Sequence, residues 1–201
     1  VVIAAGNDDL DFDENWISSP AYFSELIPGV ISVAAAANSG QIATYSNYGS
    51  KVTIAAPGGS GILESDGTYP LDGLFATAPL SPQDTYYEFG PSYENMEGTS
   101  MAAPVVSGAI ALLYEENPSL TPAEVETILQ DSADQRKDLE GFVLNGAFLD
   151  LEEALIMAGQ PPYDCGGDEV FRFYHPTNGV PFFTSHLCSH FFSLSSLVSR
   201  T

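Results

Sequence analysis

Short apolar runs alternate with helical patterns over the first 160 residues of the chain. Residues 1–5 and 30–36 are rich in Val, Ile and Ala, which is typical of strands buried on both faces of a sheet, and residues 52–55 indicate a third strand. Residues 100–116 are small and apolar almost all round, which predicts a helix buried in a larger protein. This alternation predicts a three-layer α/β fold with a mainly parallel sheet.

The ends of the predicted helices carry recognisable signals. The first helix ends before Pro118, because the residue that precedes a proline is pushed out of the helical conformation. The segment Thr121-Pro122-Ala123-Glu124 combines an N-cap, a proline at the first helical position and a capping-box glutamate. The helix that it opens is predicted to reach about residue 133, with apolar residues at helical spacing: Val125, Ile128 and Leu129. Residues 150–158 predict a last helix, again capped by an acidic residue, Asp150.

A serine stands at the start of the first helix. Gly98 allows a tight turn before it, and Pro104 falls in the first turn, where a missing N–H costs little. This placing exposes the Ser100 hydroxyl beside unpaired backbone N–H groups, which favour developing negative charge. The residues alone leave two interpretations open: Ser100 is a nucleophile, or it only caps the helix.

Four segments together resemble the subtilisin-like serine proteases, the subtilases. Gly98-Thr99-Ser100-Met101-Ala102-Ala103-Pro104 resembles the nucleophile segment of that family. Three other segments follow the family's order: Val1-Val2-Ile3-Ala4-Ala5-Gly6-Asn7, then residues 29–35 with 43–49, then Val52-Thr53-Ile54-Ala55-Ala56-Pro57-Gly58-Gly59. The resemblance covers about residues 1–158. It implies the C-terminal half of a peptidase domain, whose incomplete sheet is expected to continue with upstream strands beside residues 1–5.

The resemblance also implies roles for individual residues. It makes Ser100 the nucleophile that forms an acyl-enzyme with a peptide or protein substrate. It makes Asn7 an oxyanion-hole residue, whose amide donates to the developing oxyanion beside the Ser100 N–H. Ala4, Ala5 and Gly6 are then expected to form one wall of the pocket for the substrate side chain before the scissile bond. Without the resemblance, the sequence Gly-Asn-Asp is more typical of an asparagine that satisfies a turn.

A general base for Ser100 is missing from its expected place. Serine attack needs a base within hydrogen-bond reach, and subtilases supply the triad in the order Asp, His, Ser. Here no histidine precedes Ser100, and His175, His186 and His190 match no position of the family. We therefore expect the Asp and His upstream in a longer chain, and no activity of these 201 residues alone. The alternative is a non-catalytic, protease-like module for binding or surface attachment.

The charge of the chain is strongly acidic. Its 27 acidic and 5 basic side chains give a formal net charge of −22, which argues against binding to nucleic acid or an anionic membrane. Lysine-poor acidity is consistent with a secreted enzyme, and two origins stay open: adaptation to salt, or an ordinary acidic extracellular protein. No apolar run reaches the length of about eighteen residues that a membrane span requires.

Residues 8–14 concentrate five carboxylates in seven positions. Acids at positions 9, 11 and 13 resemble the start of a calcium loop, but the glycine and distant glutamate of such a loop are missing. We interpret the segment as a solvated, charged loop and expect no metal site in this chain. No cofactor is expected, and calcium stays open for a full-length protein, because subtilases often bind it elsewhere.

Two segments lie outside the helical and strand patterns. Residues 60–97 read as one long connection rich in Gly, Pro, Ser and Tyr, and we expect it to border the active cleft. The prolines that follow Gln160 predict a linker, which divides a peptidase part, residues 1–160, from a small β-rich and aromatic-rich module, residues 161–201.

The module is predicted to form a β-hairpin around Asn178-Gly179. It resembles the aromatic-rich repeat modules of secreted bacterial hydrolases, which implies surface attachment through the tail. Cys165 and Cys188 leave open whether they form a disulfide. The spacing of His186, Cys188 and His190 leaves a metal site open, although the incomplete ligand set favours a structural role.

Overall fold

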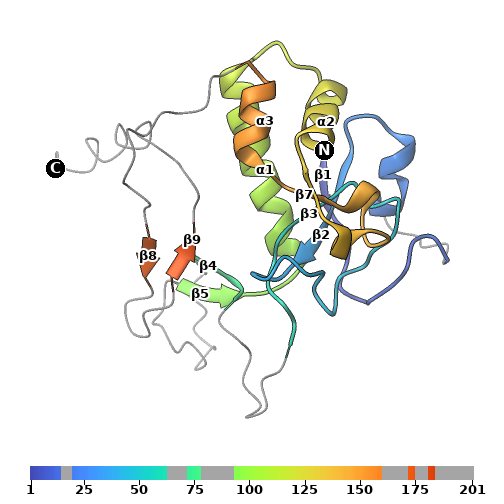
Figure 1. Ribbon diagram of the computed structural model, residues 1–201, viewed down its shortest axis with the longest axis vertical. Coiled ribbons are helices and arrows are strands. Elements are labelled where there is room, and N and C mark those ends of the chain that lie inside the picture. Colours follow the sequence, from blue (N-terminus) through green and yellow to red (C-terminus); the bar gives the residue numbers. More distant parts are fainter. Residues whose placement is uncertain (15–19, 63–71, 78–92, 160–171, 175–180, 184–201) are drawn as a thin grey trace.

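The computed structural model describes residues 1–14, 20–62, 72–77 and 93–159, and the backbone of two strands near the C-terminus. Its centre is a five-stranded sheet in the order β1-β2-β3-β7-β6 (Figure 1). The strands are β1 (Val2–Ala4), β2 (Ile31–Ala36), β3 (Ile54–Pro57), β7 (Ala147–Phe148) and β6 (Asp134–Gln135). β1, β2, β3 and β7 run parallel, and β6 pairs antiparallel with β7. The mainly parallel sheet is confirmed, and so are its three predicted strands.

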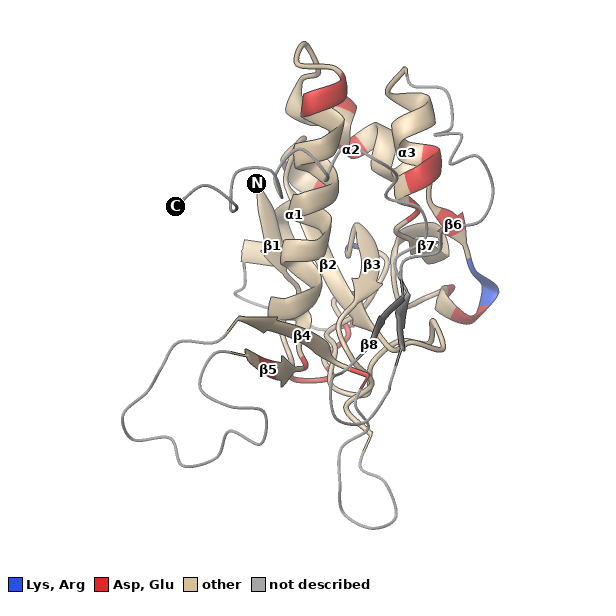
Figure 2. Ribbon diagram, turned by 90° about the vertical axis from the view of Figure 1, so that its left-hand side faces the viewer, with Lys and Arg blue, Asp and Glu red and all other residues tan. Residues whose placement is uncertain are grey.

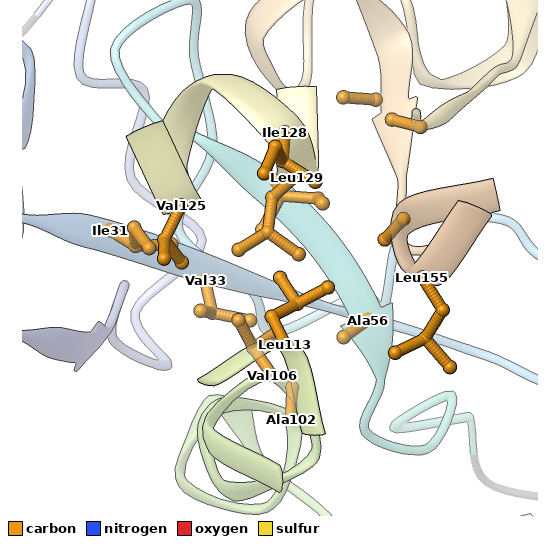
Figure 3. Packing of buried hydrophobic residues seen from close by; sticks show 14 of the residues in the cluster. Ile31, Val33, Ala56, Ala102, Val106, Leu113, Val125, Ile128, Leu129 and Leu155 are labelled. Atoms are coloured by element: carbon orange, nitrogen blue, oxygen red, sulfur yellow. The ribbon is translucent and has the colours of Figure 1, made fainter. Parts of the chain in front are cut away.

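Three helices cover one face of this sheet: α1 (Thr99–Glu116), α2 (Pro122–Asp131) and α3 (Leu151–Met157) (Figure 1). Alternate residues of β2 point to this face, and Figure 3 shows how they meet the helices in a core that includes Ile31, Val33, Val106, Leu113, Val125 and Leu129. The other residues of β2 face a second core with Phe12, Ala21, Leu139 and Val143. All six residues of β2 are buried, as expected for a strand covered on both sides.

The predicted helix signals are confirmed. Thr121 and Glu124 form a capping box at α2, in which the Thr121 N–H donates to Glu124 Oε2 at 2.7 Å. Asp150 caps α3 by accepting from the Glu153 N–H at 3.1 Å. α1 ends before Asn117, directly ahead of the proline. α1 was expected to be buried almost all round. In the described part of the chain, however, one of its faces is exposed, at Ser100, Pro104, Ser107, Gly108, Ala111 and Glu115.

The sequence patterns missed several elements. The long connection of residues 60–97 contains a β-hairpin of β4 (Leu74–Thr77) and β5 (Tyr93–Met96), in which Leu74 pairs with Met96. The remaining missed elements are β6, β7 and three 3-10 helices: η1 (Pro20–Leu26), η2 (Lys137–Leu139) and η3 (Leu144–Gly146). In the tail, β8 (Arg172–Tyr174) pairs antiparallel with β9 (Pro181–Phe183), in agreement with the predicted hairpin.

The charged residues of the described part of the chain are mostly acidic. Figure 2 shows acidic residues on several elements, whereas the basic residues within residues 1–14, 20–62, 72–77 and 93–159 are Lys51, Arg136 and Lys137. Lys51 and Arg136 each have an acidic neighbour, with Lys51 Nζ 3.9 Å from Asp13 and Arg136 Nε 3.2 Å from Asp134. Within the part of the chain that is described, no helix has the length and apolarity to cross a bilayer.

Candidate active site

The N-terminus of α1 lies at the carboxyl ends of the parallel strands. β1 ends at Ala4, three residues before Asn7, and the Gly6 N–H donates to Thr99 Oγ1 at 3.1 Å. β3 ends one residue before Gly58, whose carbonyl accepts from the Gly98 N–H at 2.9 Å. The start of α1 is therefore held on two strands at once. The crevice outside the carboxyl ends of strands is where open α/β sheets bind their ligands.

Ser100 is exposed and is the second residue of α1. The N-cap is Gly98, which makes no side-chain capping bond, so the interpretation of Ser100 as the cap is wrong. The N–H groups of Met101 and Ala102 donate to the Gly98 carbonyl. Among the described residues, nothing accepts from the Ser100 N–H. An exposed hydroxyl thus stands beside a free donor at the positive end of an 18-residue helix.

Asn7 is tied to the helix start by its carboxamide oxygen. Asn7 Oδ1 accepts from the Thr99 N–H at 3.0 Å and from the Thr99 hydroxyl at 2.8 Å. Asn7 therefore caps the first N–H of α1 from 92 residues away and does not close a local turn with that oxygen. With the oxygen occupied, Nδ2 is left as a donor, and no described residue accepts from it.

The two free donors border one small space beside Gly98. A Cβ placed on Gly98 would lie 3.5 Å from Asn7 Nδ2 and 3.7 Å from the Ser100 nitrogen. The backbone of Gly98 has φ +146°, which only glycine adopts without strain. The absence of a side chain at this position therefore keeps open a site that two N–H donors reach, next to an exposed hydroxyl.

The three residues predicted to form a pocket wall differ in exposure. Ala4 and Gly6 are partly exposed, whereas Ala5 is 1% exposed and its methyl group packs into the second core. The backbone of Ala5 is also engaged, because its N–H donates to the Val33 carbonyl at 2.9 Å. Ala4 and Gly6 can face a ligand with their side chain or backbone, while the Ala5 side chain cannot.

A carboxyl pair lies at the base of the β4–β5 hairpin, directly before the nucleophile segment. Glu97 Oε2 accepts from the Gly61 N–H at 2.9 Å, and Asp72 Oδ1 accepts from the Ser60 N–H at 3.3 Å. Burial raises the pKa of Glu97, and the hydrogen bond between its side chain and that of Asp72 raises this pKa further. Glu97 Oε1 is buried and has no hydrogen-bond partner among the described residues, a setting that favours the neutral, protonated carboxyl.

The acidic segment of residues 8–14 is more structured than the predicted solvated loop. Asp13 accepts from the N–H and the hydroxyl of Ser50, both at 2.7 Å. Partial burial alone would raise the pKa of Asp13, but the bonds from Ser50 and the charge of Lys51 lower it overall. In the described ranges, no three His, Cys, Asp or Glu side chains gather as a metal site.

The contact of Thr99 with Asn7 was not predicted from the sequence, although Thr99 lies inside the segment that resembles the family's nucleophile motif. Thr99 and Asn7 lie 92 residues apart in the chain, so no local sequence pattern indicates that they meet. The three histidines and two cysteines lie outside the described residues, as does the predicted turn at Asn178-Gly179.

Comparisons with known proteins agree on one family. A sequence model described as "Subtilase family" matches residues 1–148. The chain is 40% identical to an extracellular protease of Xanthomonas campestris pv. campestris over 136 residues, which cover 66% of this chain and 19% of that protein. It is 30% identical to the serine protease AprX of Bacillus subtilis over 165 residues, covering 77% of this chain and 35% of AprX.

Solved structures show the same likeness. A protease of Pseudoalteromonas arctica PAMC 21717 matches with a TM-score of 0.57 at 33% identity, covering 79% of this chain and 42% of the other. Fervidolysin from Fervidobacterium pennivorans, described as a keratinolytic enzyme related to subtilisin, matches with a TM-score of 0.55 at 27% identity, covering 85% and 24%. The chain spans less than half the length of these relatives.

Proposed function

Because the chain belongs to the subtilase family, we propose that it carries the nucleophile and oxyanion hole of a serine endopeptidase. The observation that carries this proposal is the pair of free donors, Ser100 N–H and Asn7 Nδ2, which border one space beside an exposed serine hydroxyl. Donors fixed in advance around a developing negative charge stabilise a transition state without reorganising. The substrate is a peptide or protein.

The reaction divides into two similar halves. Ser100 Oγ attacks the carbonyl carbon of the scissile bond while its proton passes to a general base. The resulting oxyanion accepts from Ser100 N–H and Asn7 Nδ2, and the C–N bond then breaks as the base returns the proton to the leaving amine. Water repeats the sequence on the acyl-enzyme and frees Ser100. In subtilisin itself, losing the corresponding asparagine donor costs about 10²–10³ in kcat, a magnitude that belongs to that relative.

The general base is proposed to come from outside these 201 residues. A base must reach the serine hydroxyl, and the part of the chain that the structure describes contains no histidine. The family supplies its Asp and His before the serine, and the curated relatives are much longer than this chain. The 201-residue chain alone is therefore inactive under this proposal.

Two further parts of the proposal concern the setting of the enzyme. Secretion is supported by relatives that are named extracellular proteases, in Xanthomonas campestris and Dichelobacter nodosus. The division into residues 1–160 and 161–201, with surface attachment through the second part, rests on the linker and the aromatic pattern of the sequence.

Labelling by a peptidyl phosphonate tests this function, because the reaction needs an activated serine. A longer protein that includes the upstream Asp and His should be labelled, and Ser100→Ala should abolish the labelling. Ser107→Ala is the matched control, since Ser107 lies exposed on the same face of α1 and its hydroxyl donates to the Ala103 carbonyl. Labelling of the 201-residue chain alone would contradict the proposed source of the base. An unlabelled longer protein would favour the non-catalytic binding module.

A further inference from the structure

One buried asparagine holds the backbone on both sides of Asn7. Asn47 is 3% exposed, and its Oδ1 accepts from the N–H groups of Asp8 and Leu10, each at 3.0 Å. Its Nδ2 donates to the Ala5 carbonyl at 3.0 Å, and its own N–H donates to the Gly6 carbonyl at 2.9 Å. A single residue therefore makes four hydrogen bonds to the segment that surrounds Asn7, two before it and two after it.

Asn47 is itself fixed to the sheet. The Ser46 hydroxyl donates to the Asn47 carbonyl at 3.0 Å and accepts from the Ala35 N–H of β2, also at 3.0 Å. The contact with the Asn7 segment is close, because a Cβ on Gly6 would lie 2.3 Å from Asn47 Nδ2. Gly6 has φ +110°, so a glycine is needed here both for space and for backbone conformation. Asn47 therefore links the segment around Asn7 to β2.

We propose that Asn47 is a positioning residue for the oxyanion hole. It fixes the backbone of Asn7, while Thr99 fixes the carboxamide oxygen of Asn7, and together they aim Asn7 Nδ2 at the space beside the Ser100 N–H. This inference rests on the proposed function of Asn7 and Ser100.

The chemistry of the site explains why the residue is an asparagine. The segment offers two N–H donors and one carbonyl acceptor to the same buried side chain, and a carboxamide supplies the matching acceptor and donor. Aspartate keeps the acceptor but loses the donor, and its charge would be buried. Alanine leaves three backbone groups without partners, which loosens the segment although backbone bonds such as Asn47 N–H to the Gly6 carbonyl remain.

The test is a double-mutant cycle in the longer protein that carries the upstream base. We expect Asn47→Ala to lower kcat about 10–100-fold, with KM within about twofold, since the loss cannot exceed that of the asparagine donor it aims. In an Asn7→Ala background, Asn47→Ala should lower kcat by less than about twofold, because no donor is left to aim. An equal loss in both backgrounds would overturn the inference.

Three controls separate the possible failures. Thr53→Val changes another side chain that is 3% exposed and bonds Ser32 on β2, and it should lower the unfolding midpoint without changing kcat. If Asn7→Ala leaves kcat unchanged, the proposed role of Asn7 fails; if it lowers kcat but Asn47→Ala acts additively, only the present inference fails. Should Asn47→Ala not fold, the same cycle is run with Asn47→Asp, which keeps both acceptor bonds.

A binding measurement gives an independent readout. A peptidyl boronate places a tetrahedral oxygen in the oxyanion hole, whereas the matching peptide amide does not. In Asn47→Asp we expect affinity for the boronate to fall at least about tenfold more than affinity for the amide. Equal losses for both ligands would mean a purely structural role and would overturn the inference.

Discussion

Thr99 contacts the Asn7 segment through both its backbone and its side chain. Its N–H and its hydroxyl donate to Asn7 Oδ1 at 3.0 and 2.8 Å, and the same hydroxyl accepts from the Gly6 N–H at 3.1 Å. Thr99 is 1% exposed and is followed directly by Ser100. The orientation of the Asn7 amide and the start of the helix that carries Ser100 are therefore set by the same residue.

The Thr99 hydroxyl can be tested separately from its backbone. Thr99→Val keeps the shape and the N–H but removes two of the three bonds, so kcat should fall about tenfold, as expected for the loss of about 1–1.5 kcal/mol of hydrogen bonding. Thr99→Ser keeps the hydroxyl and should stay within about twofold of wild type. Steady-state kinetics of the longer protein provide the measurement. A loss in Thr99→Ser with a wild-type kcat in Thr99→Val would show that packing of the methyl group, and not the hydroxyl, matters.

Gly98 should be the most sensitive glycine near the site. Gly98→Ala adds a methyl group within 4 Å of both proposed oxyanion donors and forces an L-residue to φ +146°. We expect a loss of about a hundredfold or more in kcat, comparable to the loss of one donor. Gly108→Ala is the control: its new Cβ would meet nothing within 4 Å, and it should raise the free energy of unfolding by about 0.5–1 kcal/mol at unchanged kcat. Similar kinetics of the two variants would contradict the described geometry.

The Glu97–Asp72 pair predicts a pH-dependent stability. Between the usual glutamate pKa of 4.5 and the raised pKa of Glu97, the folded state binds more protons than the unfolded state. The contribution of Glu97 is thus fully present below pH 4.5 and is lost as the pH rises through the raised pKa. In Glu97→Gln the amide donates to Asp72 at every pH, so the decline disappears and the variant becomes more stable than wild type above this window.

Urea unfolding of wild type and Glu97→Gln, across roughly pH 4–8, measures the difference between their free energies of unfolding. The free energy of unfolding of the variant, minus that of wild type, should increase with pH and then level off. Asp72→Asn removes the partner charge and should reduce the same slope. A difference that stays constant with pH would mean that the pKa of Glu97 is not raised in the folded protein.

The capping box of α2 makes a quantitative prediction for stability. Thr121→Ala removes the hydroxyl that accepts from the Glu124 N–H and should lower the free energy of unfolding by about 1 kcal/mol. Thr127→Ala on the same helix removes a hydroxyl that bonds the Ala123 carbonyl, and it should be neutral or stabilising because alanine has the higher helix propensity. Denaturant titrations of both variants measure these changes. A larger loss of unfolding free energy in Thr127→Ala than in Thr121→Ala would argue against the cap.

The elements that were predicted correctly all have signals within a short stretch of sequence. β1, β2 and β3 were visible as apolar runs, and the starts of α2 and α3 were visible because Thr121 and Asp150 bond residues three positions away. The β4–β5 hairpin was missed because its strands are four residues each and pair across a long connection. β7 was missed because two residues make no pattern, and its partner β3 lies about ninety positions earlier.

The residues of the candidate site were predicted from the family resemblance more than from physical patterns in the sequence. Ser100 and Asn7 were assigned from the subtilase motifs, since a serine at a helix start and an asparagine after glycine each have commoner explanations. Thr99 and Asn47 received no role, because their bonds to the Asn7 segment span 92 and about forty positions and leave no periodic trace. The exposed face of α1 was missed for a related reason: small apolar residues do not reveal whether a neighbour covers them.

The N-terminal cap of α1 comes from the far end of the described chain. A copy in which α1 has formed but has not yet docked on β1 has an uncapped helix, and its Asn7 amide is not oriented. Docking completes both at once, so a chain whose helix has not yet joined the sheet has neither the cap nor the oriented amide.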